Sequence, residues 1–129
     1  MALQTRYLFT ASMDVEPSKE ALFNEVYDTE HVPMLLTVPG VIAVARLSKL
    51  PGGTEAEFAL LVSDQYQNRG LGTELLRRLI QVARDEKLVR LGADVLAENR
   101  EMQRLCEKLG FTIQRELGEP TVRAELELL

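Results

Sequence analysis

Residues 60–72 read Leu-Leu-Val-Ser-Asp-Gln-Tyr-Gln-Asn-Arg-Gly-Leu-Gly, an apolar run that leads through a polar loop with two glycines into a helical pattern. Free N–H groups at a helix start carry partial positive charge, and glycines let that backbone approach a bulky anion closely. The stretch therefore predicts a strand, a turn and a helix start that hold a phosphate or pyrophosphate. A plain strand-to-helix turn stays open as the alternative, because glycines also occur in ordinary turns.

The periodicity of apolar residues extends this unit in both directions. We expect strands at 3–15, 41–47, 56–62, 89–96, 111–116 and 122–128, with helices after Pro17, from Leu71 and after Asn99. The helix from Leu71 has its apolar face on Leu71, Leu75, Leu76, Leu79, Ile80, Val82 and Ala83. The order is β-α-β-β-α-β-α-β-β, which predicts an α+β fold in which helices flank a single mixed sheet. We expect residues 1–129 to form one domain.

Composition excludes several classes of function. The 129 residues carry a net charge of -5 and no basic block, which speaks against a nucleic-acid partner. The most apolar stretch, 32–47, is interrupted by two prolines and a glycine and is too short to span a bilayer. One cysteine, Cys106, cannot form an internal disulfide, so the cytoplasm is the expected compartment. One histidine, His31, with no clustered carboxylates makes no recognisable metal site.

Two motifs carry a family resemblance. Gln67-Asn68-Arg69-Gly70-Leu71-Gly72 resembles the Gln/Arg-x-x-Gly-x-Gly/Ala signature of the GNAT superfamily of N-acetyltransferases. Asn99, followed by Leu-Cys-Glu-Lys-Leu-Gly-Phe at 105–111, resembles the superfamily's second motif at its usual separation. The resemblance covers residues 41–129 and is strongest to the acetyltransferase domains of bacterial protein-lysine acetyltransferases. It implies an acyl-CoA N-acyltransferase fold that binds acetyl-CoA and acetylates an amine by direct attack in a ternary complex.

The resemblance also implies roles for individual residues. Backbone amides of the loop and helix start hold the cofactor pyrophosphate, at Gln67, Asn68, Arg69, Gly70, Leu71, Gly72 and Thr73. Leu61 and Val62 offer backbone hydrogen bonds to the pantetheine arm. Asn99 contacts the cofactor, although a helix cap is an equal interpretation of the same residue.

The resemblance places the catalytic residue on the strand that precedes the loop, at 56–62. The family often carries a general base where Glu57 stands, and Glu57 points away from the side of the strand that bears Phe58. A solvated strand residue is the alternative, and Glu55 is the neighbouring competitor. Many members place a tyrosine, as general acid, where this chain has Cys106. Cys106 shares an apolar stripe with Met102, Leu105 and Leu109, which favours a buried structural thiol over a covalent acetyl-cysteine route.

The N-terminal third differs. Residues 7–41, above all 27–41, resemble the first half of a ferredoxin-like dimeric α+β barrel of the kind found in EthD-like proteins and small monooxygenases. Residues 1–40 are thus an altered, barrel-like portion, and a hybrid joined near 41–46 is one interpretation. This resemblance implies a homodimer through the N-terminal strand and helix. In the barrel family a residue such as His31 lines a small-molecule pocket, whereas a lone histidine near a helix end favours a structural or exposed role.

Three functions therefore compete. The first is an N-acetyltransferase acting on a protein lysine or a small amine. The second is a ligand-binding or monooxygenase-like barrel, against which stand the extra helix and two extra strands of the C-terminal half. The third is a non-catalytic hybrid. None of them calls for a membrane, a nucleic acid or a metal.

Overall fold

The computed structural model describes residues 17–19, 22, 39, 41–63, 67 and 70–129. The chain divides into two compact units, Met1–Val44 with Leu61–Gly72, and Ala45–Leu60 with Thr73–Leu129. The expected first strand, nearly all of the first helix, and His31 lie outside the described residues. Of that region the structure gives a short 3-10 turn, η1 (Pro17–Lys19).

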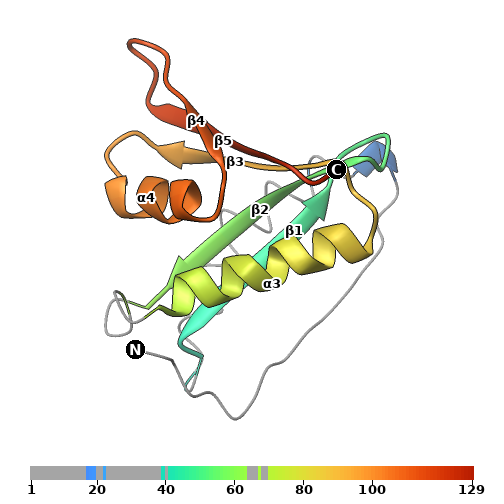
Figure 1. Cartoon of the computed structure of the whole chain (residues 1–129), viewed down its shortest axis with the longest axis horizontal. Helices are drawn as coiled ribbons and strands as arrows, with labels where there is room; N and C mark the ends of the chain where they lie inside the picture. Colours follow the sequence, from blue (N-terminus) through green and yellow to red (C-terminus); the bar gives the residue numbers. More distant parts are fainter. Residues whose placement is uncertain (1–16, 20–21, 23–38, 40, 64–66, 68–69) are drawn as a thin grey trace. The chain divides into compact units, whose positions relative to one another are not determined.

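Five strands form one mixed sheet in the order β1-β2-β3-β5-β4 (Figure 1). The strands are β1 (Ala43–Lys49), β2 (Glu55–Val62), β3 (Arg90–Leu96), β4 (Thr112–Gln114) and β5 (Thr121–Glu127). β2 and β3 are parallel, whereas β5 is antiparallel to both β3 and β4. A parallel pair needs a crossover, which α3 (Leu71–Asp85) supplies. The predicted mixed sheet with flanking helices is confirmed; β1 starts two residues later than expected, and β4 is shorter.

A tight turn joins β1 to β2. Gly52 and Gly53 adopt φ values of 99° and 72°, in the left-handed region that favours glycine. Leu50 N–H donates to Glu55 O at 2.8 Å, and Gly53 N–H donates to Leu50 O at 3.0 Å. The Pro-Gly-Gly-Thr sequence at 51–54 therefore forms the turn that it predicts.

α3 buries one stripe of its surface. Leu76, Ile80 and Ala83 are buried, which confirms the centre of the predicted apolar face. Val82 was wrongly included, because its side chain is 45% exposed. At 100° per residue, position 82 falls nearly opposite position 80 on the helix, so Val82 cannot share the stripe of Ile80.

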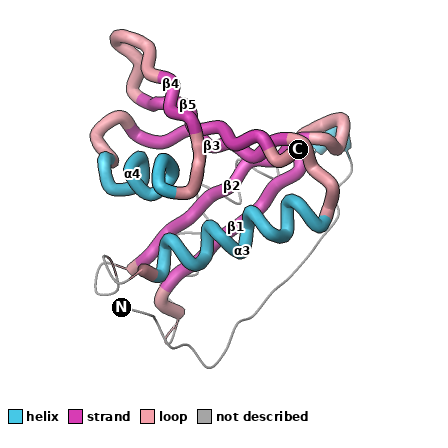
Figure 2. Tube along the Cα trace, viewed as in Figure 1, coloured by secondary structure: helices cyan, strands magenta, loops and turns pink. Residues whose placement is uncertain are grey.

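α4 (Arg100–Lys108) begins and ends with side-chain and backbone caps. Asn99 Oδ1 accepts a hydrogen bond from Met102 N–H at 3.1 Å. At the other end Gly110 has a φ of 99°, its N–H donates to Glu107 O at 3.1 Å, and Phe111 N–H donates to Cys106 O at 3.0 Å. This pair of bonds is a Schellman motif, and it forms the turn between α4 and β4 (Figure 2).

The core lies between the helices and one face of the sheet. It combines side chains from three strands, both helices and the segments that precede β3 and β4, namely Ala56, Phe58, Leu76, Ile80, Ala83, Leu88, Leu91, Ala93, Val95, Cys106, Phe111, Val122 and Ala124. Because side chains alternate along a strand, the intervening residues of β2, β3 and β5 share the opposite face. That face carries Glu55, Glu57, Arg90, Gly92, Asp94, Arg123, Glu125 and Glu127.

Candidate functional site

The loop after β2 ends in a left-handed glycine. Gly70 has a φ of 82°, and α3 begins at the next residue, Leu71. The first four N–H groups of a helix have no partner within the helix, so Leu71, Gly72 and Thr73 present donors at this end. The binding of an anion at this helix start stays a prediction. Asn68 and Arg69 lie outside the described residues.

The end of β2 offers a backbone acceptor beside this loop. Gln67 Nε2 donates to Val62 O at 3.2 Å, so this carbonyl takes a hydrogen bond from a side chain. Leu61, the residue before it, is exposed. The predicted role of Val62 toward a pantetheine arm stays a prediction.

The first turn of α3 also contains a carboxylate, Glu74. A negative charge here would compete with a bound anion for the positive helix end. Two arginines of the same helix offset it: Arg78 Nε lies 3.3 Å and Arg77 Nη1 lies 3.8 Å from the Glu74 carboxylate. The turn therefore remains compatible with a pyrophosphate.

A buried glutamine ties α4 to the end of β3. Gln103 Nε2 donates to Leu96 O at 3.1 Å and to Ala97 O at 3.0 Å. Its Oε1 is buried and has no hydrogen-bond partner in the described part of the chain. These bonds fix the start of α4, and so the position of Asn99, relative to the strand. The sequence gives no signal for the role of Gln103, because a glutamine in a helix is usually exposed.

Glu57 lies in an ion-pair cluster on the polar face of the sheet. Arg123 Nη1 lies 2.7 Å from Glu57 Oε1 and 3.4 Å from Asp94 Oδ1. Burial of the guanidinium disfavours its charge, but the hydrogen bond and charge of Glu57, with those of Asp94, raise the pKa of Arg123 above its usual value. The cluster therefore holds a permanent cation between two carboxylates.

Glu55, the competitor of Glu57, belongs to a second cluster. Arg90 stands between its two cross-strand neighbours, with Nη1 3.0 Å from Glu55 Oε1 and Nε 2.8 Å from Glu127 Oε1. Arg90 Nε also lies 3.3 Å from Glu125 Oε2. The hydrogen bond to Glu127 and its charge, followed by the charge of Glu55, raise the pKa of Arg90.

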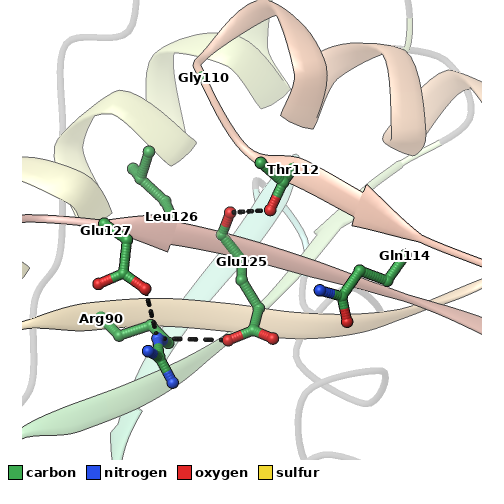
Figure 3. A pocket seen from close by; sticks show the side chains of 7 residues that line it. All are labelled: Arg90, Gly110, Thr112, Gln114, Glu125, Leu126 and Glu127. Carbon is green, nitrogen blue, oxygen red and sulfur yellow. Dashed lines mark hydrogen bonds and ion pairs between the residues drawn. The ribbon is translucent and has the colours of Figure 1, made fainter.

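Arg90 borders a surface groove of about 410 Å³. In Figure 3 its guanidinium points toward the carboxylates of Glu125 and Glu127, and the Thr112 hydroxyl points toward the main-chain oxygen of Glu125. The remaining lining residues are Gly110, Gln114 and Leu126. No residue predicted to bind the cofactor lines this groove, and Arg90 already pairs with Glu125 and Glu127 there, so we assign no ligand to the groove.

Comparison with known proteins decides the family. The profile of the acetyltransferase (GNAT) family matches residues 3–111. This chain belongs to the GNAT acetyltransferase family. The match includes the N-terminal segment as well as both motifs.

Among relatives, the chain is 37% identical over 101 residues to the acetyltransferase Pat of Mycolicibacterium smegmatis, covering 75% of this chain and 30% of that protein. It is 28% identical over 116 residues to the acetyltransferase PA5475 of Pseudomonas aeruginosa, covering 84% of this chain and 62% of that protein. The chain thus spans less than two thirds of the length of either relative.

Solved structures agree on the fold. The GNAT domain of S. lividans PAT superposes with a TM-score of 0.61 at 35% identity, covering 71% of this chain and 57% of that one. The protein yncA of Salmonella typhimurium, solved with its cofactor acetyl-CoA, also gives a TM-score of 0.61, at 21% identity and with 89% of this chain and 91% of that one covered. The second likeness supports the fold alone.

The family resemblance places a tyrosine, in many members, where this chain has Cys106, and the structure shows the environment of the thiol. The Cys106 side chain is 0% exposed. Burial, with a smaller effect of the Glu107 charge, raises the pKa of the Cys106 thiol to about 11. A buried thiol that stays protonated at neutral pH is a poor nucleophile, which confirms the structural interpretation of Cys106.

Two further observations concern the described residues. Among the described residues, no group of three or more His, Cys, Asp or Glu side chains is placed to hold a metal ion. None of the described helices is both long and apolar enough to cross a membrane.

Proposed function

We propose that this chain is an acetyl-CoA-dependent N-acetyltransferase that acetylates an amine, either a protein lysine or a small amine. One observation carries the proposal: β2 runs into a loop that ends with Gly70 in the left-handed region, directly before the first turn of α3. In a family member this arrangement supports binding of the acetyl-CoA pyrophosphate at residues 67–73.

The other residues have roles consistent with this site. The backbone of Leu61 and Val62 binds the pantetheine arm, and Asn99 contacts the cofactor from the start of α4. Bound acetyl-CoA supplies the thioester whose carbonyl the amine attacks. Glu57 accepts the proton of the acceptor ammonium, so that the neutral amine reacts directly in a ternary complex.

Cofactor binding is the first test. Calorimetry should give a micromolar or tighter affinity for acetyl-CoA in the unmodified chain and a loss of at least 10-fold, about 1.4 kcal/mol, in Gly72→Leu. Glu119→Leu, in an exposed turn, is the matched control and should bind normally. Equal affinity in Gly72→Leu and in the control would refute the assignment of the loop.

Turnover is the second test. Thiol release measured over a panel of amines and lysine peptides identifies the acceptor.

Three proposals concern the N-terminal portion: that it is barrel-like, that it forms a homodimer, and that the chain originated as a hybrid. If these proposals hold, we expect the chain to bind acetyl-CoA but to turn it over slowly. Turnover of about 1 per second or more on any acceptor would refute impairment, and light scattering that shows only monomer would refute the dimer.

Absence of both acetyl-CoA binding and turnover would remove the acetyltransferase proposal. The competing interpretation as a barrel with a small-molecule pocket, or as a non-catalytic hybrid, would then apply.

We also propose the cytoplasm as the compartment, on the basis of the single cysteine, and cell fractionation tests this proposal.

A further inference from the structure

Arg123 reaches across a whole strand to contact Glu57. In the register of the sheet Arg123 stands opposite Asp94, whereas Glu57 pairs with Gly92 on β3. Neighbouring strands are about 4.8 Å apart, so the guanidinium must pass over β3 to reach β2. Its shorter contact is nevertheless to the distant Glu57, at 2.7 Å, and its longer contact is to the adjacent Asp94, at 3.4 Å.

Gly92 provides the path for this crossing. A Cβ atom at this position would lie 2.6 Å from Arg123 Nη2, 3.1 Å from Arg123 Cζ and 3.1 Å from Ala124 O. Gly92 is not among the residues with positive φ, so its backbone conformation does not require glycine. Glycine weakens a strand interior and often marks close approach of another group. Space for the guanidinium is therefore what requires glycine here.

The cluster has more negative than positive charge and is open to solvent. One guanidinium faces two carboxylates, and the side chains are 29% exposed for Arg123, 38% for Glu57 and 62% for Asp94. The pair of Arg123 with Glu57 is part-buried rather than fully exposed, and ion pairs that keep contact with solvent contribute only modestly to stability. A second cation that arrives from solvent can therefore compete with Arg123 for Glu57 at a small cost.

We propose that Arg123 is a specificity-determining latch, which occupies Glu57 until the ammonium group of the acceptor displaces it onto Asp94. This inference rests on the proposed role of Glu57 as the base. On displacement the Arg123 guanidinium keeps a carboxylate partner, its directly opposed neighbour on β3. Only a cationic acceptor can replace the guanidinium, so the latch selects amines that arrive as ammonium ions.

The test compares four changes, two of which release Glu57 in different ways. Arg123→Met removes the competing cation, whereas Gly92→Ala keeps the cation and blocks its path. Both should lower the KM for Nα-acetyl-lysine N-methylamide by about 2- to 5-fold, the range set by an ion pair that keeps contact with solvent, with kcat changed less. Asp94→Asn removes the position to which Arg123 retreats and should raise the KM. Arg123→Lys keeps a cation and should return the KM toward that of the unmodified chain.

Arg90→Met is the matched control. It removes one positive charge from the same face, but Arg90 contacts Glu55, Glu125 and Glu127 rather than Glu57. A fall in KM in Arg90→Met equal to that in Arg123→Met would show a general charge effect and overturn the latch. An unchanged or raised KM in Arg123→Met would overturn it as well, whether or not Gly92→Ala folds.

A binding measurement separates failure of the latch from failure of the proposed function. NMR titration with the same lysine amide should show tighter binding to Arg123→Met than to the unmodified chain. Tighter binding without thiol release in any variant would support the latch and refute the acetyltransferase. Thiol release with no change in KM or amide affinity would leave the acetyltransferase intact and refute the latch.

Discussion

The ring of Phe111 packs edge-on against the ring of Phe58, with centroids 5.5 Å apart and an interplanar angle of 67°. Phe111 ends the second family motif and Phe58 follows the proposed base on β2, so this contact joins two segments that lie 53 positions apart in the sequence. Gly110 makes the contact geometrically feasible, because its left-handed conformation turns the chain back after α4 and directs it into β4.

This aromatic pair predicts a measurable coupling. Phe58→Leu, Phe111→Leu and the double variant should each unfold at lower urea concentration than the unmodified chain. The double-mutant cycle should give a coupling free energy of about 0.5–1.5 kcal/mol, the usual value for an edge-to-face pair. Leu117→Ala, at a fully exposed position, should change the unfolding free energy by less than about 0.5 kcal/mol. Strict additivity of Phe58→Leu and Phe111→Leu would contradict the pairing.

The Cys106 thiol predicts a loss of stability at alkaline pH. Its pKa is about 11 in the folded chain, against an ordinary value of 9.0, chiefly because of burial. The folded state therefore holds the proton more tightly, and the contribution to stability is complete below pH 9 and is lost as the pH rises toward 11. Two pKa units correspond to about 2–3 kcal/mol.

Cys106→Ser isolates this contribution, because serine does not titrate in the range while every other group remains. The difference in unfolding free energy between the unmodified chain and Cys106→Ser should shrink by about 2 kcal/mol between pH 8 and pH 11. A difference that stays constant with pH would contradict the raised pKa.

Asn99 has two assigned roles that substitution can separate. Its Oδ1 caps α4 through Met102 N–H, and serine retains capping ability whereas alanine does not. Asn99→Ala should therefore lower the unfolding free energy by about 1 kcal/mol, and Asn99→Ser by less. If the amide also contacts the cofactor, acetyl-CoA affinity measured by calorimetry should fall several-fold in both variants. Normal affinity in Asn99→Ser would leave Asn99 as a cap alone.

The sequence alone predicts the features that depend on local chemistry. The Gly52-Gly53 turn, the Asn99 cap and the Gly110 stop each follow from conformations or hydrogen bonds that few residue types provide. The single mixed sheet with flanking helices was also predicted, from the order of the elements along the chain, whereas the order of the strands within the sheet was not. The element boundaries were less accurate, because β1 and β4 depend on which backbone groups find partners in the sheet.

The ion-pair clusters could not be predicted in the same way. Charged residues at Arg90 and Asp94, and again at Arg123, Glu125 and Glu127, alternate with apolar residues and so indicate one polar face. However, the contact between Arg123 and Glu57 depends on the register of three strands and on the missing side chain of Gly92. No short sequence motif encodes the register of the three strands or the space that Gly92 leaves for the Arg123 side chain.

The two glutamates of β2 give the sharpest test of the catalytic assignment. Glu55 and Glu57 lie on the same face of the same strand, and each pairs with one arginine, Arg90 or Arg123. Glu57→Gln keeps the shape of the side chain and removes its ability to accept a proton. If Glu57 is the base, kcat should fall by about 10²- to 10⁴-fold while the acetyl-CoA affinity measured by calorimetry stays unchanged. Glu55→Gln removes one negative charge from the same face of the sheet, as Glu57→Gln does, and should keep kcat within a few-fold of the unmodified chain. The opposite pattern would transfer the role to Glu55, and full activity in both variants would mean that solvent or a residue outside β2 removes the proton.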